Sequence, residues 1–419
     1  TIDVSGANGV PAGASINSIS VRADGLVAVA VENPVKTDNG WVGFLDATTL
    51  EFLDVVEVGA LPDMVLISPD GTQAITANEG EPNDDYTVDP EGSISVIALP
   101  EDVAPPAQSD VRTATFHDYE ADGTKNLPDG VRVFGEFPHG ADNPVSRNLE
   151  PEYVAVSGDR AYVTLQENNA IAVVDLETAE VVEILPLGVK DHAVSGNGID
   201  ASDRVSEPNI TTYPFLKGLY QPDAIAAYEV DGQTYLVTAN EGDSRSDWGD
   251  YAEDVRLKHL GKLDENPAAK GYLCDYILDE FPGINTDPHL GRLNVSVESP
   301  FDEEAGCYTE IHAFGARSFT VWDTAGNVVF DSGDDFEQLL VELLPDNYNS
   351  NHSETSQNTR SDDKGPEPEG LTIGEIDGRT YVFIGFERVG GVIAYDITDP
   401  AAAKYVTYVN NRLCRSLSK

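Results

Sequence analysis

The chain has 419 residues, of which 74 are acidic and 25 are basic, so its formal net charge is −49 at pH 7. The long-range field of such a chain repels nucleic acid and anionic membranes and excludes both as stable partners. Self-repulsion also works against compactness unless salt or divalent cations screen the charge, and a halophilic or marine source fits best. No apolar stretch is long enough to span a bilayer, so membrane insertion is not expected.

An internal repeat organises the chain. One unit runs from Pro62-Asp63 to the pentapeptide Thr-Ala-Asn-Glu-Gly at 76–80, and the same pentapeptide recurs at 238–242. Two apolar runs within the unit are separated by Ser68-Pro-Asp-Gly, where proline and glycine suit a tight turn. A third apolar run follows at 93–98. The pattern predicts small antiparallel sheets of three or four strands.

Units begin near Asn17, Asp63, Glu152, Asp223 and Glu369, and a strand pair within 312–331 supplies a sixth unit. Such units must stack on their neighbours to bury their apolar surface, which favours a β-propeller. We expect an all-β propeller of seven blades, with six to eight as the range, in a single domain over 1–419. A seventh blade would use the strand-like segment 131–135 or the termini.

Long polar insertions interrupt the units at 100–148, 190–220, 243–308 and 345–366, and loops of this length are usually functional or held by ions or disulfides. Helical periodicity is limited to a short segment at 336–344.

Cys274 and Cys307 bracket the 243–308 insertion, which has no evident core. A disulfide between them would close a loop of about 34 residues and stabilise the fold by about 3–4 kcal/mol in the chain-entropy model. Two unrelated buried thiols are the alternative. Cys414 stands alone near the end of the chain, and no cysteine pair has zinc-finger spacing.

Two carboxylates recur in every unit, one after the proline that opens it and one after its second apolar run. In a propeller these positions converge on the central channel, where neighbouring carboxylates stay ionised only if cations sit among them. Oxygen-rich sites favour Ca²⁺, with Mg²⁺, Mn²⁺ or Fe as alternatives, and Asn78 and Asn240 would add carbonyl ligands. A purely structural role, hydrogen bonding to backbone N–H groups, is the other interpretation. The eight candidate metal ligands are Asp63, Glu79, Glu152, Glu167, Asp223, Glu241, Glu369 and Glu387.

Basic residues are scarce, and several of them flank the repeats. They either neutralise the acidic channel or clamp a phosphoryl or carboxylate group beside bound metal. Arg245, Arg317 and His192 are the candidate catalytic residues, with the arginines on phosphoryl oxygens and the histidine as a ligand or general acid. Further candidates of the same kinds are Arg147, Lys364, Arg388, His259 and His312.

Several long segments resemble the bacterial choice-of-anchor I family over nearly the whole chain. They include Leu61-Pro-Asp-Met, Ala77-Asn-Glu-Gly-Glu-Pro-Asn, Leu149-Glu-Pro-Glu-Tyr, Tyr220-Gln-Pro-Asp-Ala-Ile, Ala313-Phe-Gly-Ala-Arg-Ser-Phe and Lys364-Gly-Pro-Glu-Pro-Glu-Gly. That family is similar to animal mesenchyme-specific cell-surface glycoproteins and comprises exported propellers, whose members are often labelled alkaline phosphatase. Members usually have one more unit at each end, so the resemblance implies that the terminal blades here lack parts.

Two functions remain open. The first is a secreted, divalent-metal-dependent hydrolase of small phosphoesters, which the resemblance suggests. Asp243-Ser-Arg245 and Asp362-Asp-Lys364 slightly favour it, because their local basic residues break the symmetry of the repeat. The second is a non-catalytic, Ca²⁺-stabilised propeller that presents loops to a surface polymer or a partner protein. Both imply a secreted, periplasmic or cell-surface location and a monomer.

Overall fold

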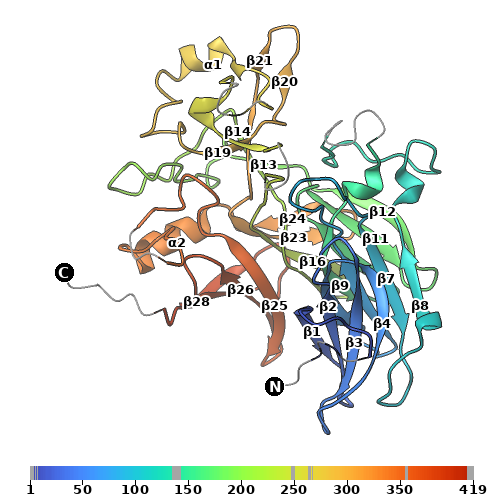
Figure 1. Ribbon diagram of the computed structural model, residues 1–419. Coiled ribbons are helices and arrows are strands. Elements are labelled where there is room, and N and C mark those ends of the chain that lie inside the picture. The colour runs from blue at the N-terminus through green and yellow to red at the C-terminus, as the bar shows by residue number, and fades with distance from the viewer. Residues whose placement is uncertain are drawn as a thin grey trace. The chain divides into compact units, whose positions relative to one another are not determined.

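A computed structural model describes residues 4, 6, 8–134, 143–246, 251–262, 266, 268–353 and 357–412, and Cys414 lies outside these ranges. The chain forms two compact units, unit 1 over residues 1–186 and unit 2 over residues 187–247 and 251–419. In Figure 1, unit 1 runs from blue to green and unit 2 from green to red. No helix among the described residues is long and apolar enough to cross a membrane.

Unit 1 contains three antiparallel sheets of four strands each, and within each sheet the strands pair in chain order. Short 3-10 helices at Gln108–Asp110, His117–Tyr119 and Val145–Arg147 lie in the connections after the second sheet's third and fourth strands. The predicted units at Asn17, Asp63 and Glu152 are confirmed as sheets. Their strands are β1 (Ser15–Val21), β2 (Leu26–Glu32), β3 (Asn39–Asp46) and β4 (Glu51–Ala60); β5 (Pro62–Ile67), β6 (Gln73–Asn78), β7 (Ser93–Ala98) and β8 (Val111–Ala114); and β9 (Pro151–Ser157), β10 (Arg160–Leu165), β11 (Ala170–Asp175) and β12 (Glu180–Pro186).

The inner strands of unit 1 read as continuous apolar runs because both faces of their sheets are covered. Every residue of β2 from Leu26 to Val31 is buried, whereas β4 at the sheet edge mixes buried and exposed positions. One core cluster joins the first sheet to the second through side chains such as Phe44 and Ile67. Another joins the second to the third through Ile75 and Val163. The repeat therefore buries its apolar surface by stacking sheet on sheet.

Unit 2 contains two more four-stranded antiparallel sheets. The helix α2 (Asp335–Leu343) packs Phe336 and Leu340 into their shared core and confirms the predicted helix at 336–344. The strands are β15 (Ile225–Val230), β16 (Gln233–Asn240), β23 (Ser318–Asp323) and β24 (Val328–Asp331), and β25 (Pro368–Ile376), β26 (Arg379–Phe386), β27 (Val392–Asp396) and β28 (Lys404–Val409).

The prediction that 312–331 forms a separate unit is wrong. The strand β23 pairs with β16, with Asn240 opposite Ser318, so these strands complete the sheet that begins near Asp223. The long 243–308 insertion separates the second and third strands of this sheet in the sequence and hides their pairing. The segment 131–134, expected to be a strand, has no regular secondary structure, and residue 135 lies outside the described ranges.

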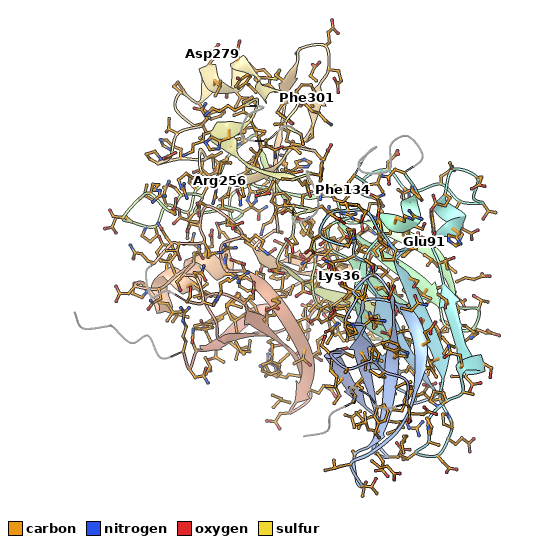
Figure 2. The ribbon with its side chains drawn as sticks, in the orientation of Figure 1. Lys36, Glu91, Phe134, Arg256, Asp279 and Phe301 are labelled. Atoms are coloured by element: carbon orange, nitrogen blue, oxygen red, sulfur yellow. A yellow bond between two sulfur atoms is a disulfide. The ribbon has the colours of Figure 1, made fainter. Side chains whose placement is uncertain are left out.

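The prediction that the 243–308 insertion lacks a core is also wrong. Together with 190–220 it builds a five-stranded sheet, a three-stranded sheet, the helix α1 (Asp275–Glu280) and a 3-10 turn at Leu257–His259. Buried side chains from both insertions, including Phe215, Leu290 and Val295, form one cluster. Phe301, labelled in Figure 2, packs edge-on against the ring of Tyr308. The strands are β13 (Val189–Asp191), β14 (Leu216–Leu219), β22 (Ile311–Ala313), β19 (Asn294–Ser296) and β17 (Asp254–Arg256), and β18 (Tyr272–Leu273), β21 (Cys307–Tyr308) and β20 (Phe301–Asp302).

Cys274 and Cys307 form a disulfide, which confirms the predicted pairing. Cys274 directly precedes α1, Cys307 opens β21, and their Cα atoms are 4.9 Å apart. The bridge therefore fastens α1 to the three-stranded sheet.

Replacing both cysteines by serine should lower the free energy of unfolding of unit 2 by about 3 kcal/mol, because the unfolded chain regains the entropy of an open loop. The variant should still fold, since the apolar cluster holds the insertion without the bridge. Thermal unfolding of the variant beside the parent measures the loss. Rapid alkylation of both thiols in the native parent without reductant would contradict the bridge.

Candidate functional site: the repeated carboxylates

The repeat places its first carboxylate at an irregular point of the sheet. Asp63, Glu152 and Glu369 each follow a proline at the start of the first strand, where the register with the second strand shifts. A β-bulge re-aims side chains and lets a strand-edge carboxylate leave the regular alternation. Asp223 lies just before β15 and is buried. The second carboxylates, Glu79, Glu167, Glu241 and Glu387, follow the ends of β6, β10, β16 and β26.

The residue before the proline is a third recurring position that we did not select from the sequence. Leu61, Gln221 and Glu367 have φ values of 49°, 40° and 54°, which residues before proline rarely adopt. The Leu61 carbonyl accepts a hydrogen bond from the Glu79 N–H, and the Glu367 carbonyl accepts one from the Glu387 N–H, each at 2.9 Å. The duplicated Glu-Pro-Glu sequence was the available signal, because it shows that this position is acidic in two units.

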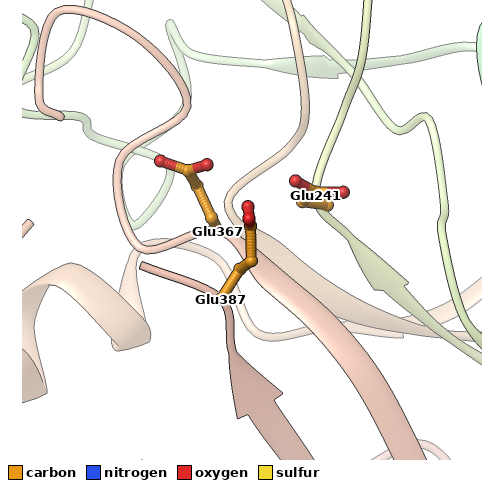
Figure 3. Close-up of side chains that lie close together, drawn as sticks. All are labelled: Glu241, Glu367 and Glu387. Carbon is orange, nitrogen blue, oxygen red and sulfur yellow. The ribbon is translucent and has the colours of Figure 1, made fainter. Parts of the chain in front are cut away.

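In unit 2 this third position completes a cluster of carboxylates. Glu241, Glu367 and Glu387 each place one carboxylate oxygen within 4.8 Å of the other two. Figure 3 shows these side chains converging from the end of β16, the start of β25 and the end of β26. Glu241 and Glu387 are two of the eight candidate ligands from the sequence, whereas the third member, Glu367, is not among them. Glu369 is half-buried nearby, and burial followed by the charge of Glu241 raises its pKa.

Three basic side chains pair with this cluster. The Lys364 Nζ lies 2.7 Å from Glu241 Oε1, and the Arg360 Nε lies 2.6 Å from Glu367 Oε1. Arg388 bridges the remaining oxygens, with its Nε 3.2 Å from Glu367 Oε2 and 2.9 Å from Glu387 Oε2. Lys364 and Arg388 stood out in the sequence, whereas Arg360 did not. Each carboxylate of the cluster therefore has a cation beside it.

The cations leave part of the negative charge uncompensated. Burial raises the pKa of Glu241 to about 7, although the ammonium of Lys364 opposes the rise. The pKa of Glu387 is also raised by burial, against the opposing charge of Arg388. The pKa of Lys364 is raised because Glu241, Asp243 and Glu367 outweigh its own burial. Asp243 acts on Glu241 and Glu369 acts on Glu387, so five carboxylates face three cations, and a further positive charge would stabilise the cluster.

Unit 1 gathers its own acidic group. Burial raises the pKa of Glu79 well above its usual range, and the neighbouring charges of Glu81, Glu150, Glu167 and Asp63 raise it further. The pKa of Asp63 is raised to about 6, first by burial and then by nearby carboxylates. Lys36 pairs with Glu81 at 3.0 Å. Glu152 is buried in the same unit.

The two repeat asparagines have structural roles. The Asn78 Nδ2 donates to the hydroxyls of Ser93 and Ser95 on the neighbouring strand β7. In the same way, Asn240 Nδ2 donates to Ser318 and Thr320 on β23. Their amides therefore join the second and third strands of each sheet, which explains why asparagine recurs in the pentapeptide.

The three predicted catalytic residues are all buried. His192 Nδ1 donates a hydrogen bond to the Asn197 carbonyl at 2.6 Å. The Arg317 guanidinium donates hydrogen bonds to the backbone carbonyls of Asp200 and Ser361. The Arg245 N–H donates a hydrogen bond to the Glu253 carboxylate, and the Glu253 N–H donates one to the Arg245 carbonyl. His312, on β22, pairs with Glu310 at 3.0 Å. The residues that meet the carboxylates of unit 2 are instead Lys364, Arg360 and Arg388.

His192 should make unit 2 less stable in acid. Burial, with the charge of Lys190, lowers its pKa to about 3, so the folded protein holds it neutral while the unfolded chain protonates it below about pH 6.5. His192 therefore lowers the free energy of unfolding as pH drops from 7 towards 4, and the buried carboxylates with raised pKa values act in the opposite direction. In His192→Asn the slope of the free energy of unfolding against pH should be smaller by about 1.4 kcal/mol per pH unit between pH 6 and 4. Denaturant titrations at several pH values measure the slopes, with the exposed His289→Asn as a control. Equal slopes in parent and His192→Asn would contradict the neutral imidazole.

Comparison with known proteins places the chain in a family. Over 291 residues it is 30% identical to the mesenchyme-specific cell surface glycoprotein of Strongylocentrotus purpuratus, covering 63% of this chain and 37% of that protein. Over 124 residues it is 34% identical to Gigasin-3a of Magallana gigas, covering 28% of this chain and 43% of that protein. The chain thus spans less than half the length of either relative.

Among solved structures, the WD40 domain of Toxoplasma gondii coronin aligns with 94% of this chain and 70% of its own, at 10% identity and a TM-score of 0.33. That likeness is too weak to define how the sheets are arranged. The model of the choice-of-anchor I domain, in contrast, matches residues 4–400. The chain therefore belongs to the choice-of-anchor I domain family.

Proposed function

We propose that the protein is an extracellular surface module that binds Ca²⁺ through Glu241, Glu367 and Glu387. The observation that carries the proposal is the spacing of their carboxylate oxygens, which lie within 4.8 Å of one another. Ca²⁺ binds oxygen at 2.3–2.6 Å, so two ligands on opposite sides of the ion are about 5 Å apart. The three glutamates fit around one such ion.

The chemistry of the ligands favours Ca²⁺ over the alternatives. All three side chains offer hard oxygen atoms, and Ca²⁺ accepts irregular geometry, whereas Mg²⁺ requires a near-ideal octahedron. The Glu241 carboxylate now accepts a hydrogen bond from Lys364, so an entering ion would displace that ammonium. The further carboxylates Asp243 and Glu369 support this exchange, because their charges act on Glu241 and Glu387 in addition to those of the cluster.

The extracellular location and the architecture belong to the same proposal. Family membership and the cell-surface relative favour export, and the disulfide fits an oxidising compartment. Four-stranded antiparallel sheets that pair in chain order are the blades from which propellers are built. A propeller that presents loops to a surface polymer or partner protein is our proposal for the architecture, with the five four-stranded sheets of the described residues as blades and seven as the blade number expected from the sequence.

Calcium should raise the melting temperature of the protein, because an ion that binds only the folded state adds RT ln(1 + [L]/Kd) to its stability. Glu241→Gln and Glu387→Gln should lose most of this increase. Glu375→Gln changes an exposed glutamate of β25 and should keep the full increase. Thermal unfolding in chelator and in millimolar Ca²⁺, with calorimetric titration, measures both effects. A melting temperature indifferent to Ca²⁺ in the parent would overturn the proposed site.

Metal-dependent phosphoester hydrolysis is a second proposal, favoured by Lys364 and Arg388 beside the same carboxylates. A divalent cation bound there would polarise a phosphoryl oxygen. Lys364 and Arg388, released from their carboxylates, would then neutralise the remaining phosphoryl charge, and the fork of Arg388 suits two oxygens. In this proposal Lys364 and Arg388 take the parts that the sequence assigned to Arg245, Arg317 and His192, because they are the residues that pair with the carboxylates.

If the protein hydrolyses phosphoesters, an aryl phosphate should be cleaved only in the presence of divalent cations. Lys364→Met should lower turnover by about a hundredfold, since one lost charge-assisted hydrogen bond to a transition state costs roughly 3 kcal/mol. Glu375→Gln should match the parent. Activity that resists chelation, or survives Lys364→Met unchanged, would leave the binding module as the function.

A further inference from the structure

Arg317 lies in the turn between β22 and β23 and is enclosed by protein. Its residue is 4% exposed, and its backbone has a φ of 54°. Nη1 donates to the Asp200 carbonyl and to Glu337 Oε1, both at 2.8 Å. Nη2 donates to the carbonyls of Ser361 at 2.9 Å and Asp363 at 2.7 Å. One planar guanidinium thus joins α2 to the segment at 361–363.

That segment carries the cations of the acidic cluster. Arg360 and Lys364 flank the two carbonyls that Arg317 binds, and they reach Glu367 and Glu241 respectively. The segment has no helix or strand of its own, so side chains must hold it in place. Asp362, which is buried, forms ion pairs to Arg256 and Arg292, both at 2.9 Å.

Glu337 of α2 orients Arg317 from the opposite side. Its Oε1 also accepts a hydrogen bond from Asn349 at 2.8 Å, and Oε2 accepts the Asp200 N–H at 2.9 Å. Both oxygens are therefore used within the protein, and Arg317 is the cation that pairs with this carboxylate. Asn349 additionally donates to Ser361 Oγ at 3.1 Å. The pair fixes both the start and the end of the segment that approaches the site.

Arginine suits this position for a geometric reason. Its planar fork presents two nitrogens at a fixed separation, and lysine has a single point donor. Without the guanidinium, the carbonyls of Ser361 and Asp363 would lose this donor, and an unsatisfied carbonyl away from water destabilises the fold. Movement of the segment relieves that cost, and it would withdraw Lys364 and Arg360 from their carboxylates.

We propose that Arg317, oriented by Glu337, is a positioning residue of the acidic site. It holds 360–364 so that Lys364 meets Glu241 and Arg360 meets Glu367, and it thereby sets how readily a cation enters. The effect on cation entry rests on the proposed Ca²⁺ function. The effect on the position of Lys364 is independent of that function and can be measured without any metal.

The test measures acylation of Lys364 in the folded, metal-free full chain, read by peptide mass spectrometry. In Arg317→Gln and Arg317→Lys, Lys364 should react about tenfold faster than in the parent, because its ion pair opens more often. Glu337→Gln should shift the rate in the same direction. Val321→Ala, which removes buried methyl groups from β23, controls for general loss of stability, and the exposed Lys404 is the internal standard.

Faster labelling confined to the Arg317 and Glu337 variants supports the positioning role. Parental labelling in both Arg317 variants, or equally fast labelling in Val321→Ala, overturns it. If Arg317→Gln does not fold, Arg317→Lys and Glu337→Gln retain most of the packing and decide the question. Calorimetric titration with Ca²⁺ follows on the same samples. An absence of binding in the parent overturns the cation site, and the labelling still judges Arg317.

Discussion

The turn that precedes Pro62, Pro222 and Pro368 is the constraint on which the carboxylate positions of three repeat units depend. A residue with positive φ before proline reverses the chain, and in two units its carbonyl accepts the N–H of the glutamate that follows the second strand. The bulge after the proline then re-aims the next side chain. Three side-chain positions are thus brought to one end of the sheet. These positions are far apart in the sequence, but the backbone hydrogen bond between the residue before proline and the later glutamate holds them close together.

The same turn allows different side chains at its first position. Leu61 and Gln221 keep the backbone conformation without adding charge, and Gln221 uses its amide on backbone neighbours instead. Glu367 adds a third carboxylate to the two that the motif already supplies, and Arg360 is 2.6 Å away to pair with it. The residue before proline must adopt a positive φ to form the turn, but its side chain can differ between units and so changes the chemistry of the site.

Local features of the sequence predicted much of the fold. The sheet starts, the Ser68–Gly71 turn and α2 depend on nearby residues, and the disulfide brackets one insertion. The pairing of β16 with β23 escaped prediction because the whole 243–308 insertion lies between them. At the site, Glu241 and Glu387 were found from their repeat positions. Glu367 was missed, because only the backbone conformation distinguishes the two glutamates of Glu-Pro-Glu.

Hydrogen-bond partners distinguish the basic residues that serve the fold from those that meet the acidic cluster, since Lys364 is buried as Arg317 and His192 are. Arg317 and His192 were selected because basic residues are scarce in the sequence, but this scarcity does not indicate whether a side chain is buried. A guanidinium that meets four acceptors, and an imidazole held neutral by burial, stabilise loops whose backbone would otherwise be unpaired.

In the two units the same motif has different charged surroundings. Around Glu241 the charges of Lys364 and Arg388 limit how far burial raises the carboxylate pKa values, whereas the charges acting on Glu79 are all negative. A buried carboxylate destabilises the fold unless a proton, a basic side chain or a metal ion compensates it. Unit 2 supplies basic side chains from the segment at 360–364 and from Arg388 after β26. In unit 1 the carboxylates of Glu81, Glu150 and Glu167 instead add to the effect of burial on Glu79.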